Sequence, residues 1–353
     1  MRIAIVGYHG SGKTCLFRVL GGRPNPPSGK APVLNLLNHK VPDKRLERIA
    51  KEYNSAKTTP AEITFLDVDN VIGGEKALTD EFLGHARACD ALLLLVRAFI
   101  DDNVYCHRGK IDAVRDLRDL YEELILTDIE VVDNRLKKLT QEIGRGKKES
   151  IPERDLLVKV KDILEKGQPL RDVQFKPEEE KILSPFAFMS QKPAIGVVNV
   201  NFRTQKPDID RACSECGNRG FLGMGIPVGL ETELLEIDDH SEKMAFLNEY
   251  GYSELCADSI VRGAYDILDA ITFYVANEKE ARAVQLKRGS NAYQAAGKVH
   301  TDIQAGFIRA EVFNYTLLEQ YGSLKAMRDA GKLGIEKKEY IVQEGDVVFF
   351  RFN

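Results

Sequence analysis

Residues 7–14 read GYHGSGKT and carry the clearest chemistry in the chain. A glycine-rich loop of this kind wraps its backbone N–H groups around phosphate oxygens, and the helix that follows points its positive end at the same anion. In this pattern Lys13 reaches the β- and γ-phosphates, and the hydroxyl of Thr14 is placed to bind Mg²⁺. Because an apolar segment precedes the loop and a helical pattern follows it, the match predicts a P-loop for ATP or GTP. The predicted nucleotide contacts in this loop are Gly10, Ser11, Gly12, Lys13, Thr14 and Cys15.

A carboxylate is available to complete the magnesium site. Residues 61–68 are mostly apolar and predict a strand, and Asp67 stands near its end. A carboxylate there is a natural partner for Mg²⁺, through a bound water, next to the hydroxyl of Thr14. The alternative is a carboxylate that only caps the segment after the strand.

The elements that must position these residues follow an alternating pattern. Strands are predicted at residues 2–6, 61–68, 91–99, 194–200 and 225–230, with helical patterns between them that include residues 78–89. This alternation predicts an α/β fold, a P-loop NTPase parallel sheet covered on both faces. Ligands bind such sheets at the carboxyl ends of the strands, which is where the P-loop and Asp67 lie.

The segment from 112 to 193 interrupts the α/β pattern. Six apolar residues follow a 4-3-4-3-4 spacing, and a second such pattern covers residues 157–164; the six are Ile125, Ile129, Val132, Leu136, Leu139 and Ile143. The seam is short, so it predicts an antiparallel helical hairpin within one chain rather than a long dimeric coiled coil. Basic residues near the predicted turn are candidates for RNA phosphate contacts, although a solvated turn carries such charges by default; they are Lys137, Lys138, Arg145, Lys147 and Lys148.

The last part of the chain changes character at about residue 277. Strands are predicted at residues 283–286, 305–315 and 347–352, with one helix near 316–330. This predicts a small α+β domain that carries a slight excess of basic residues, although the whole chain has a net negative charge. Its candidate RNA- or ribosome-facing residues are Lys287, Arg288, Lys298 and Arg309.

Length and composition limit the function classes. A chain of 353 residues predicts two or three domains. The formal net charge of −4 argues against a protein that coats nucleic acid indiscriminately, although a local basic patch would suffice for RNA. No apolar run is long enough to span a bilayer, and no signal peptide precedes the first strand, so a cytoplasmic protein with no membrane contact is expected. No DNA sequence readout is expected either. Cys213 and Cys216 form half of a zinc site with no second half, so reduced, unpaired thiols are expected.

Longer motifs resemble one family. These are VPDKRL at 41–46, ELILTD at 123–128, AAGKVHTD at 295–302, GFIRAEV at 306–312 and YIVQEGDV at 340–347. Together they resemble the YchF family of Obg-related P-loop NTPases over the whole chain. The resemblance implies a G domain at 1–111 and 194–276, an inserted α-helical hairpin domain at 112–193, and a C-terminal α+β TGS domain at 277–353. It also implies a cytoplasmic nucleotide switch that binds the ribosome or ribosomal RNA.

The chain departs from the family pattern around the nucleotide. The position of the first-switch threonine, which closes over Mg²⁺ in typical members, matches Ala31, and the second-switch glycine matches Asn70. The base-reading motif begins at Asn199 and Val200, but its last position, a glutamate in the family, is Phe202. A phenyl ring accepts no hydrogen bond, so a blurred preference between ATP and GTP is expected.

Hydrolysis is affected by a further departure. Members of the family are thought to use a histidine in the loop after the third strand, and the best match to that position is Cys106. His107 stands beside it and would serve after a one-residue shift; the alternative is a solvated loop histidine.

The sequence therefore predicts a divergent YchF-like protein that binds ATP or GTP, hydrolyses it slowly and associates with the ribosome. One rival is a nucleotide-dependent scaffold that binds RNA or the ribosome and never hydrolyses, which the loss of the first-switch threonine favours. A small-molecule P-loop kinase is a second rival; it would need an arginine-bearing lid and an acceptor pocket.

Overall fold

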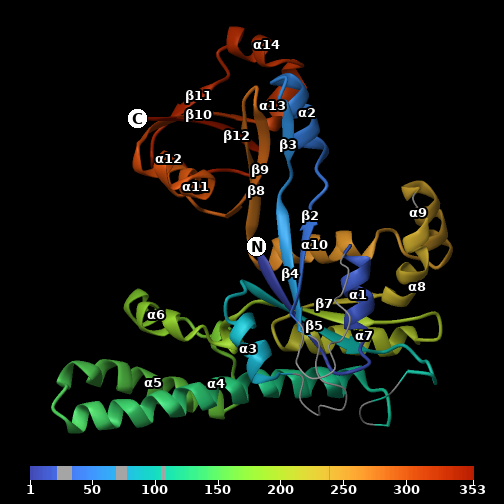
Figure 1. Ribbon diagram of the computed structural model, residues 1–353, viewed down its shortest axis with the longest axis vertical. Helices are drawn as coiled ribbons and strands as arrows, with labels where there is room; N and C mark the ends of the chain where they lie inside the picture. The colour runs from blue at the N-terminus through green and yellow to red at the C-terminus, as the bar shows by residue number, and fades with distance from the viewer. Residues whose placement is uncertain (22–33, 69–77, 105, 107–108, 238) are drawn as a thin grey trace. The chain divides into compact units, whose positions relative to one another are not determined.

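The computed structural model describes residues 1–353 except 22–33, 69–77, 105, 107–108 and 238 (Figure 1). The chain forms two compact units. One, here called the P-loop unit, comprises Arg2–Leu37 and Thr64–Ala264; the other, the C-terminal unit, comprises Met1, Asn38–Ile63 and Tyr265–Asn353. Residues 38–63 therefore belong with the C-terminal part of the chain, although in sequence they follow the P-loop and include the start of the strand that carries Asp67.

The first sheet has the strand order β2-β4-β1-β5-β6-β7, and neighbouring strands from β4 to β7 pair in parallel. Its strands are β1 (Arg2–Val6), β2 (Leu34–Lys40), β4 (Glu62–Val68), β5 (Ala91–Arg97), β6 (Ala194–Asn199) and β7 (Leu222–Ile226). Every residue of β5 and β6 is buried, as expected of parallel strands covered on both faces. The α/β fold with a parallel sheet is confirmed.

One predicted strand is wrong. The predicted segment 225–230 covers only the end of β7, and helix α8 (Val228–Glu233) follows it. Pro227 stands between them, and because proline has no N–H it cannot continue the ladder.

The helices of this part of the chain lie between the strands and in an insertion. They are α1 (Lys13–Val19), α3 (Asp80–Ala86), α4 (Ala113–Gly144), α5 (Ile151–Glu165), α6 (Pro177–Leu183), α7 (Lys206–Asn218), α8, α9 (His240–Glu249) and α10 (Cys256–Ile267). Short 3₁₀ turns are η1 (Lys148–Ser150), η2 (Leu170–Asp172), η3 (Ser184–Phe186), η4 (Met189–Gln191) and η5 (Leu234–Glu236). Helix α3 is shorter than the predicted 78–89. Among the described residues, no helix combines the length and the apolar character needed to cross a bilayer.

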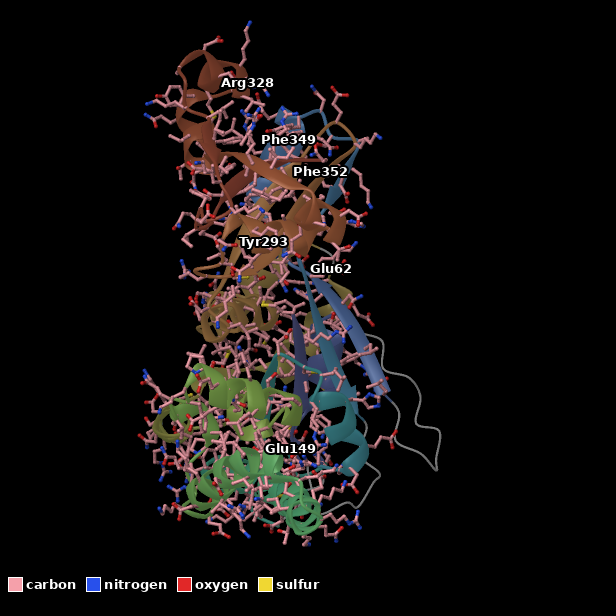
Figure 2. The ribbon with its side chains drawn as sticks, turned by 90° about the vertical axis from the view of Figure 1, so that its left-hand side faces the viewer. Glu62, Glu149, Tyr293, Arg328, Phe349 and Phe352 are labelled. Atoms are coloured by element: carbon pink, nitrogen blue, oxygen red, sulfur yellow. The ribbon has the colours of Figure 1, made fainter. Side chains whose placement is uncertain are left out.

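The predicted helical hairpin is present. Helices α4 and α5 lie side by side (Figure 1), and Val132, Leu139, Leu157 and Val160 are buried. The turn between the helices contains Glu149, labelled in Figure 2. The basic residues predicted near this turn are all exposed or half-exposed: Lys137, Lys138, Arg145, Lys147 and Lys148.

The C-terminal unit has its own mixed sheet with the order β11-β10-β12-β8-β9-β3. Its strands are β3 (Lys57–Thr59), β8 (Ala270–Ala276), β9 (Glu280–Lys287), β10 (Phe307–Asn314), β11 (Gly334–Glu336) and β12 (Asp346–Phe352). Its helices are α2 (Lys44–Glu52), α11 (Ala292–Val299), α12 (Thr301–Ala305), α13 (Tyr315–Tyr321) and α14 (Leu324–Asp329). The single helix predicted near 316–330 is wrong, because Gly322 adopts a left-handed φ of 75° that ends α13, and Ser323 caps the start of α14.

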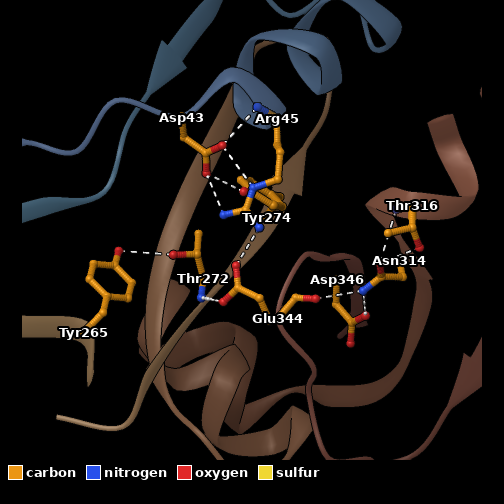
Figure 3. Close-up of polar contacts among 9 residues, drawn as sticks. All are labelled: Asp43, Arg45, Tyr265, Thr272, Tyr274, Asn314, Thr316, Glu344 and Asp346. Atoms are coloured by element: carbon orange, nitrogen blue, oxygen red, sulfur yellow. Dashed lines mark hydrogen bonds and ion pairs between the residues drawn. The ribbon is translucent and has the colours of Figure 1, made fainter. Parts of the chain in front are cut away.

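A polar network fixes residues 38–63 to the C-terminal sheet (Figure 3). Asp43 caps α2 by accepting from the backbone N–H of Arg45 at 2.9 Å, and it also accepts from the hydroxyl of Tyr274 on β8. The guanidinium of Arg45 donates to one carboxylate oxygen of Glu344 at 2.6 Å, and the backbone N–H of Thr272 donates to the other at 2.8 Å. Two segments more than 200 residues apart in sequence thereby share one set of hydrogen bonds.

Candidate functional site

The P-loop joins β1 to α1 at the carboxyl end of the parallel sheet, and its glycines meet specific backbone demands. A side chain at Gly7 would bring its Cβ to 2.5 Å from the carbonyl oxygen of Leu95 on β5. Gly10 and Gly12 have φ values of 80° and 100°, which L-residues with side chains adopt only at a cost. The loop therefore keeps a shape that only glycine permits at these places.

Lys13 is folded over its own loop. Its Nζ donates to the carbonyl oxygen of Gly7 at 2.5 Å and to that of Tyr8 at 3.3 Å. Thr14 is exposed and Cys15 is half-buried in the same turn of α1. The ammonium group thus lies at the loop where the predicted phosphates would bind, and the side chain of Thr14 is open to solvent.

Asn199 holds the P-loop in place from the end of β6. It is the last residue of β6, its side chain is buried, and its Nδ2 donates to the carbonyl oxygen of Ser11 at 3.0 Å. A Cβ at Gly12 would collide with the same nitrogen. The segment predicted to read the base and the P-loop are therefore in direct contact.

Asp67 lies where the sequence places it, one residue before the end of β4, and it is buried. Strand β4 pairs in parallel with β1, with Leu66 opposite Ala4, so Asp67 lies level with the last residues of β1 before the P-loop. A buried carboxylate and an exposed hydroxyl, at Asp67 and Thr14, supply the oxygen ligands that Mg²⁺ prefers.

The rest of the segment predicted to read the base forms a turn after β6. Val200 is buried, the backbone N–H of Asn201 donates to the hydroxyl of Thr204 at 3.0 Å, and the hydroxyl of Thr204 reaches the carbonyl oxygen of Ala98 at 3.1 Å. Phe202 is 79% exposed at the tip of this turn. An exposed ring supplies stacking area but no hydrogen-bond acceptor.

Cys106 lies close to the P-loop. It lines a small pocket together with His9 and Ser11 of the loop and Arg115 of α4. The other candidate for the catalytic position, His107, lies outside the described residues, as do Ala31 and Asn70.

The loop that leads to Cys106 is held by a residue that sequence reasoning missed. Arg97 is buried at the end of β5, and its guanidinium donates to the carbonyl oxygens of Phe99 at 3.2 Å, Val104 at 3.0 Å and Asp101 at 2.8 Å. The sequence shows a lone arginine at the end of an apolar strand. Because a buried guanidinium needs several acceptors, this residue could have predicted a loop folded around Arg97.

Two further residues connect the P-loop to the hairpin. The hydroxyl of Tyr8 donates to Oε1 of Glu123 on α4 at 2.7 Å, and the backbone N–H of Leu78 donates to Oε2 at 3.2 Å. No local pattern reveals this contact, because its partners are 115 and 45 residues apart in sequence.

Other predicted groups lie away from this site. Cys213 and Cys216 are on α7 with free thiols, and burial raises the pKa of Cys216 to about 12. The four basic residues predicted in the C-terminal unit are all exposed or half-exposed, and one of them, Arg288, pairs with Asp269 at 2.9 Å.

A parallel sheet whose first strand enters a GxxxxGKT loop, with a buried aspartate on the adjacent strand, defines a P-loop NTPase. Residues 270–353 match the family model YchF-GTPase_C, "Protein of unknown function (DUF933)". The chain is 32% identical to the Ribosome-binding ATPase YchF of Bacillus subtilis (strain 168), over 99% of this chain and 98% of that protein. It is 29% identical to Obg-like ATPase 1 of Pongo abelii, over 100% and 92%.

The solved structure of the Schizosaccharomyces pombe YchF GTPase is similar along the whole chain. It matches with a TM-score of 0.83 at 28% identity and covers 99% of this chain and 97% of that chain. On the full-length similarity to curated relatives and to this structure, the chain belongs to the YchF family.

Proposed function

We propose that this chain binds ATP or GTP with Mg²⁺, hydrolyses it slowly and acts as a nucleotide switch on the ribosome. The observation that carries the proposal is the braced P-loop, in which Asn199 holds the carbonyl of Ser11 and Lys13 lies over the loop. Phosphate oxygens would replace the carbonyl groups of Gly7 and Tyr8 as acceptors for Lys13. The backbone contacts would come from Gly10 to Cys15, with Asn199 and Val200 beside the base.

The magnesium site is part of the proposal. Thr14 and Asp67 are the residues of this chain that would hold the ion, the aspartate through a water molecule, with the phosphates completing the coordination. The bound ion would neutralise charge on the phosphates. The fit rests on the chemistry of the donors, a hydroxyl and a carboxylate at the carboxyl end of the same sheet.

Ribosome association is proposed from the relatives. Curated relatives along the full length are named Ribosome-binding ATPase, and a partner of that kind implies a cytoplasmic protein. The proposed contact surfaces are the exposed basic turn of the hairpin and the exposed basic residues of the C-terminal unit. We retain the proposed boundaries of 1–111 and 194–276 for the G domain, 112–193 for the hairpin domain and 277–353 for a TGS domain. Residues 38–63 pack with the C-terminal part of the chain, although these boundaries assign them to the G domain. Limited proteolysis would test the boundaries, since it would separate the parts of the chain that fold independently.

A specific observation keeps the non-hydrolysing scaffold as a second candidate. Cys106 lines the pocket beside the P-loop, and a thiol is a poorer group than an imidazole for orienting a water molecule. Turnover of ATP and GTP by the wild-type chain and by Lys13→Ala decides between the candidates. Slow turnover that Lys13→Ala abolishes supports the switch, and no turnover in the presence of nucleotide binding supports the scaffold.

Ribosome binding needs its own experiment. Co-sedimentation of the chain with ribosomes, with ATP, with ADP and without nucleotide, is expected to give different bound fractions in the three states. Equal fractions in all three would contradict a nucleotide switch and leave at most a nucleotide-independent binder.

A further inference from the structure

We propose that Tyr8 and Glu123 couple nucleotide binding at the P-loop to the position of α4, and so to the helical hairpin that α4 forms with α5. The inference rests on the proposed nucleotide binding and adds a route by which the bound nucleotide acts on a distant part of the chain. All residues involved lie in the P-loop unit.

The carboxylate of Glu123 joins three segments. Its Oε1 accepts from the hydroxyl of Tyr8 at 2.7 Å, and its Oε2 accepts from the backbone N–H of Leu78 at 3.2 Å. Tyr8 is a P-loop residue, and Leu78 follows the second-switch position Asp67 by eleven residues in sequence. Tyr8 and Leu78 are both buried, at 4% and 6% exposure, so water does not readily replace these bonds.

Nucleotide binding would act directly on Tyr8. In the structure the carbonyl oxygen of Tyr8 accepts from Nζ of Lys13 at 3.3 Å and from the backbone N–H of Ser11 at 3.2 Å. A bound phosphate competes for the ammonium group of Lys13, since a charged acceptor forms the stronger hydrogen bond. The backbone of Tyr8 would then change its contacts, while its side chain remains bonded to Glu123.

The geometry of α4 extends such a shift to the hairpin. The helix has 32 residues, and Glu123 lies in its first half. At 1.5 Å per residue the distance from Asp128 to Gly144 is about 24 Å, so a tilt of about 5° about Asp128 moves the end of the helix by about 2 Å. Asp128 fixes the helix further on, where it accepts from the backbone N–H groups of Met189 at 2.8 Å and Ser190 at 2.7 Å. A shift at Glu123 would therefore turn the helix about an anchored point.

The test is hydrogen–deuterium exchange of residues 113–165 in the full chain, with and without saturating ATP. Because every protein is compared in its saturated state, differences in affinity do not enter the comparison. Tyr8→Phe removes only the hydroxyl, and the nucleotide-induced change in exchange is expected to fall about threefold to tenfold, the range of one buried hydrogen bond. Glu123→Gln keeps one acceptor oxygen and is expected to reduce the change by less.

Tyr121→Phe is the matched control. Tyr121 is on the same helix, and its hydroxyl donates to the carbonyl oxygen of Gly167 at 3.2 Å, away from the P-loop. This variant is expected to keep the wild-type response. If Tyr8→Phe binds ATP and retains the full change, or if the wild type binds ATP and shows no change in α4, the coupling is overturned. If the wild type binds no nucleotide, the proposed function fails and the coupling fails with it.

Discussion

The buried carboxyl group of Asp128 is expected to make the free energy of unfolding depend on pH. Its side chain is 1% exposed, and burial raises the pKa of the carboxyl group from 3.8 to about 6, against the opposing effect of hydrogen bonds from Ser190 and Met189. A carboxyl group with a raised pKa in the folded state stabilises the fold fully below pH 3.8 and loses that contribution as the pH rises through 6. An asparagine side chain does not titrate, so Asp128→Asn removes the pH dependence that comes from this group.

The magnitude follows from the two pKa values. A difference of about 2 units corresponds to about 3 kcal/mol over the full range, and to about 2 kcal/mol between about pH 4.5 and pH 7.5. The free energy of unfolding of the wild type, minus that of Asp128→Asn, is therefore expected to fall by about 2 kcal/mol across that interval. Because all other titrating groups are shared by the two proteins, their contributions cancel in the difference.

Urea-induced unfolding followed by circular dichroism at several pH values measures this difference. Asp128→Asn also changes one of the two backbone hydrogen bonds, which shifts the difference by a constant of about 1–2 kcal/mol and leaves its slope unaffected. A difference that is independent of pH, or that rises with pH, would contradict a raised pKa of Asp128 in the folded protein. It would mean that the backbone N–H groups of Met189 and Ser190 keep the buried carboxylate ionised.

Three further changes have expected outcomes. Gly12→Ala places a Cβ against the side-chain nitrogen of Asn199 at a residue with a left-handed φ, and it is expected to weaken nucleotide affinity at least about tenfold in calorimetry. The control is Gly84→Ala, where a Cβ meets open space, and this variant is expected to leave the affinity unchanged. Phe202→Glu places a carboxylate at the exposed last position of the predicted base-reading motif and is expected to raise the ratio of ATP to GTP affinity by about twofold to tenfold, measured by displacement of a labelled nucleotide. Tyr274→Phe removes a buried hydroxyl and is expected to lower the free energy of unfolding of the C-terminal unit by about 1–2 kcal/mol, with the more exposed Tyr293→Phe as the control.

Local patterns predicted the elements that carry the site. Strand β1, the P-loop and α1 follow from one apolar run and one glycine-rich motif, and β5 and β6 follow from apolar runs typical of buried parallel strands. The hairpin follows from heptad-like spacing. These features depend on residues close together in the chain, which is why the sequence alone was sufficient.

Features that depend on distant contacts were not predictable in this way. Strand β2 mixes leucine with asparagine, histidine and lysine and is only partly buried, and β3 has three residues, so neither forms a continuous apolar run. The membership of residues 38–63 in the C-terminal unit depends on contacts such as that between Asp43 and Tyr274. The contact between Tyr8 and Glu123 is of the same kind, since each residue has an ordinary local context.

We propose that this P-loop binds purine nucleotides with little discrimination between the bases. Calorimetric titration of the protein with ATP and with GTP, both with Mg²⁺, tests it most directly, and Lys13→Ala is the control. We expect micromolar affinity for both nucleotides, within about tenfold of each other, and loss of both in Lys13→Ala. Absence of binding by the wild type, or binding that survives in Lys13→Ala, would contradict it.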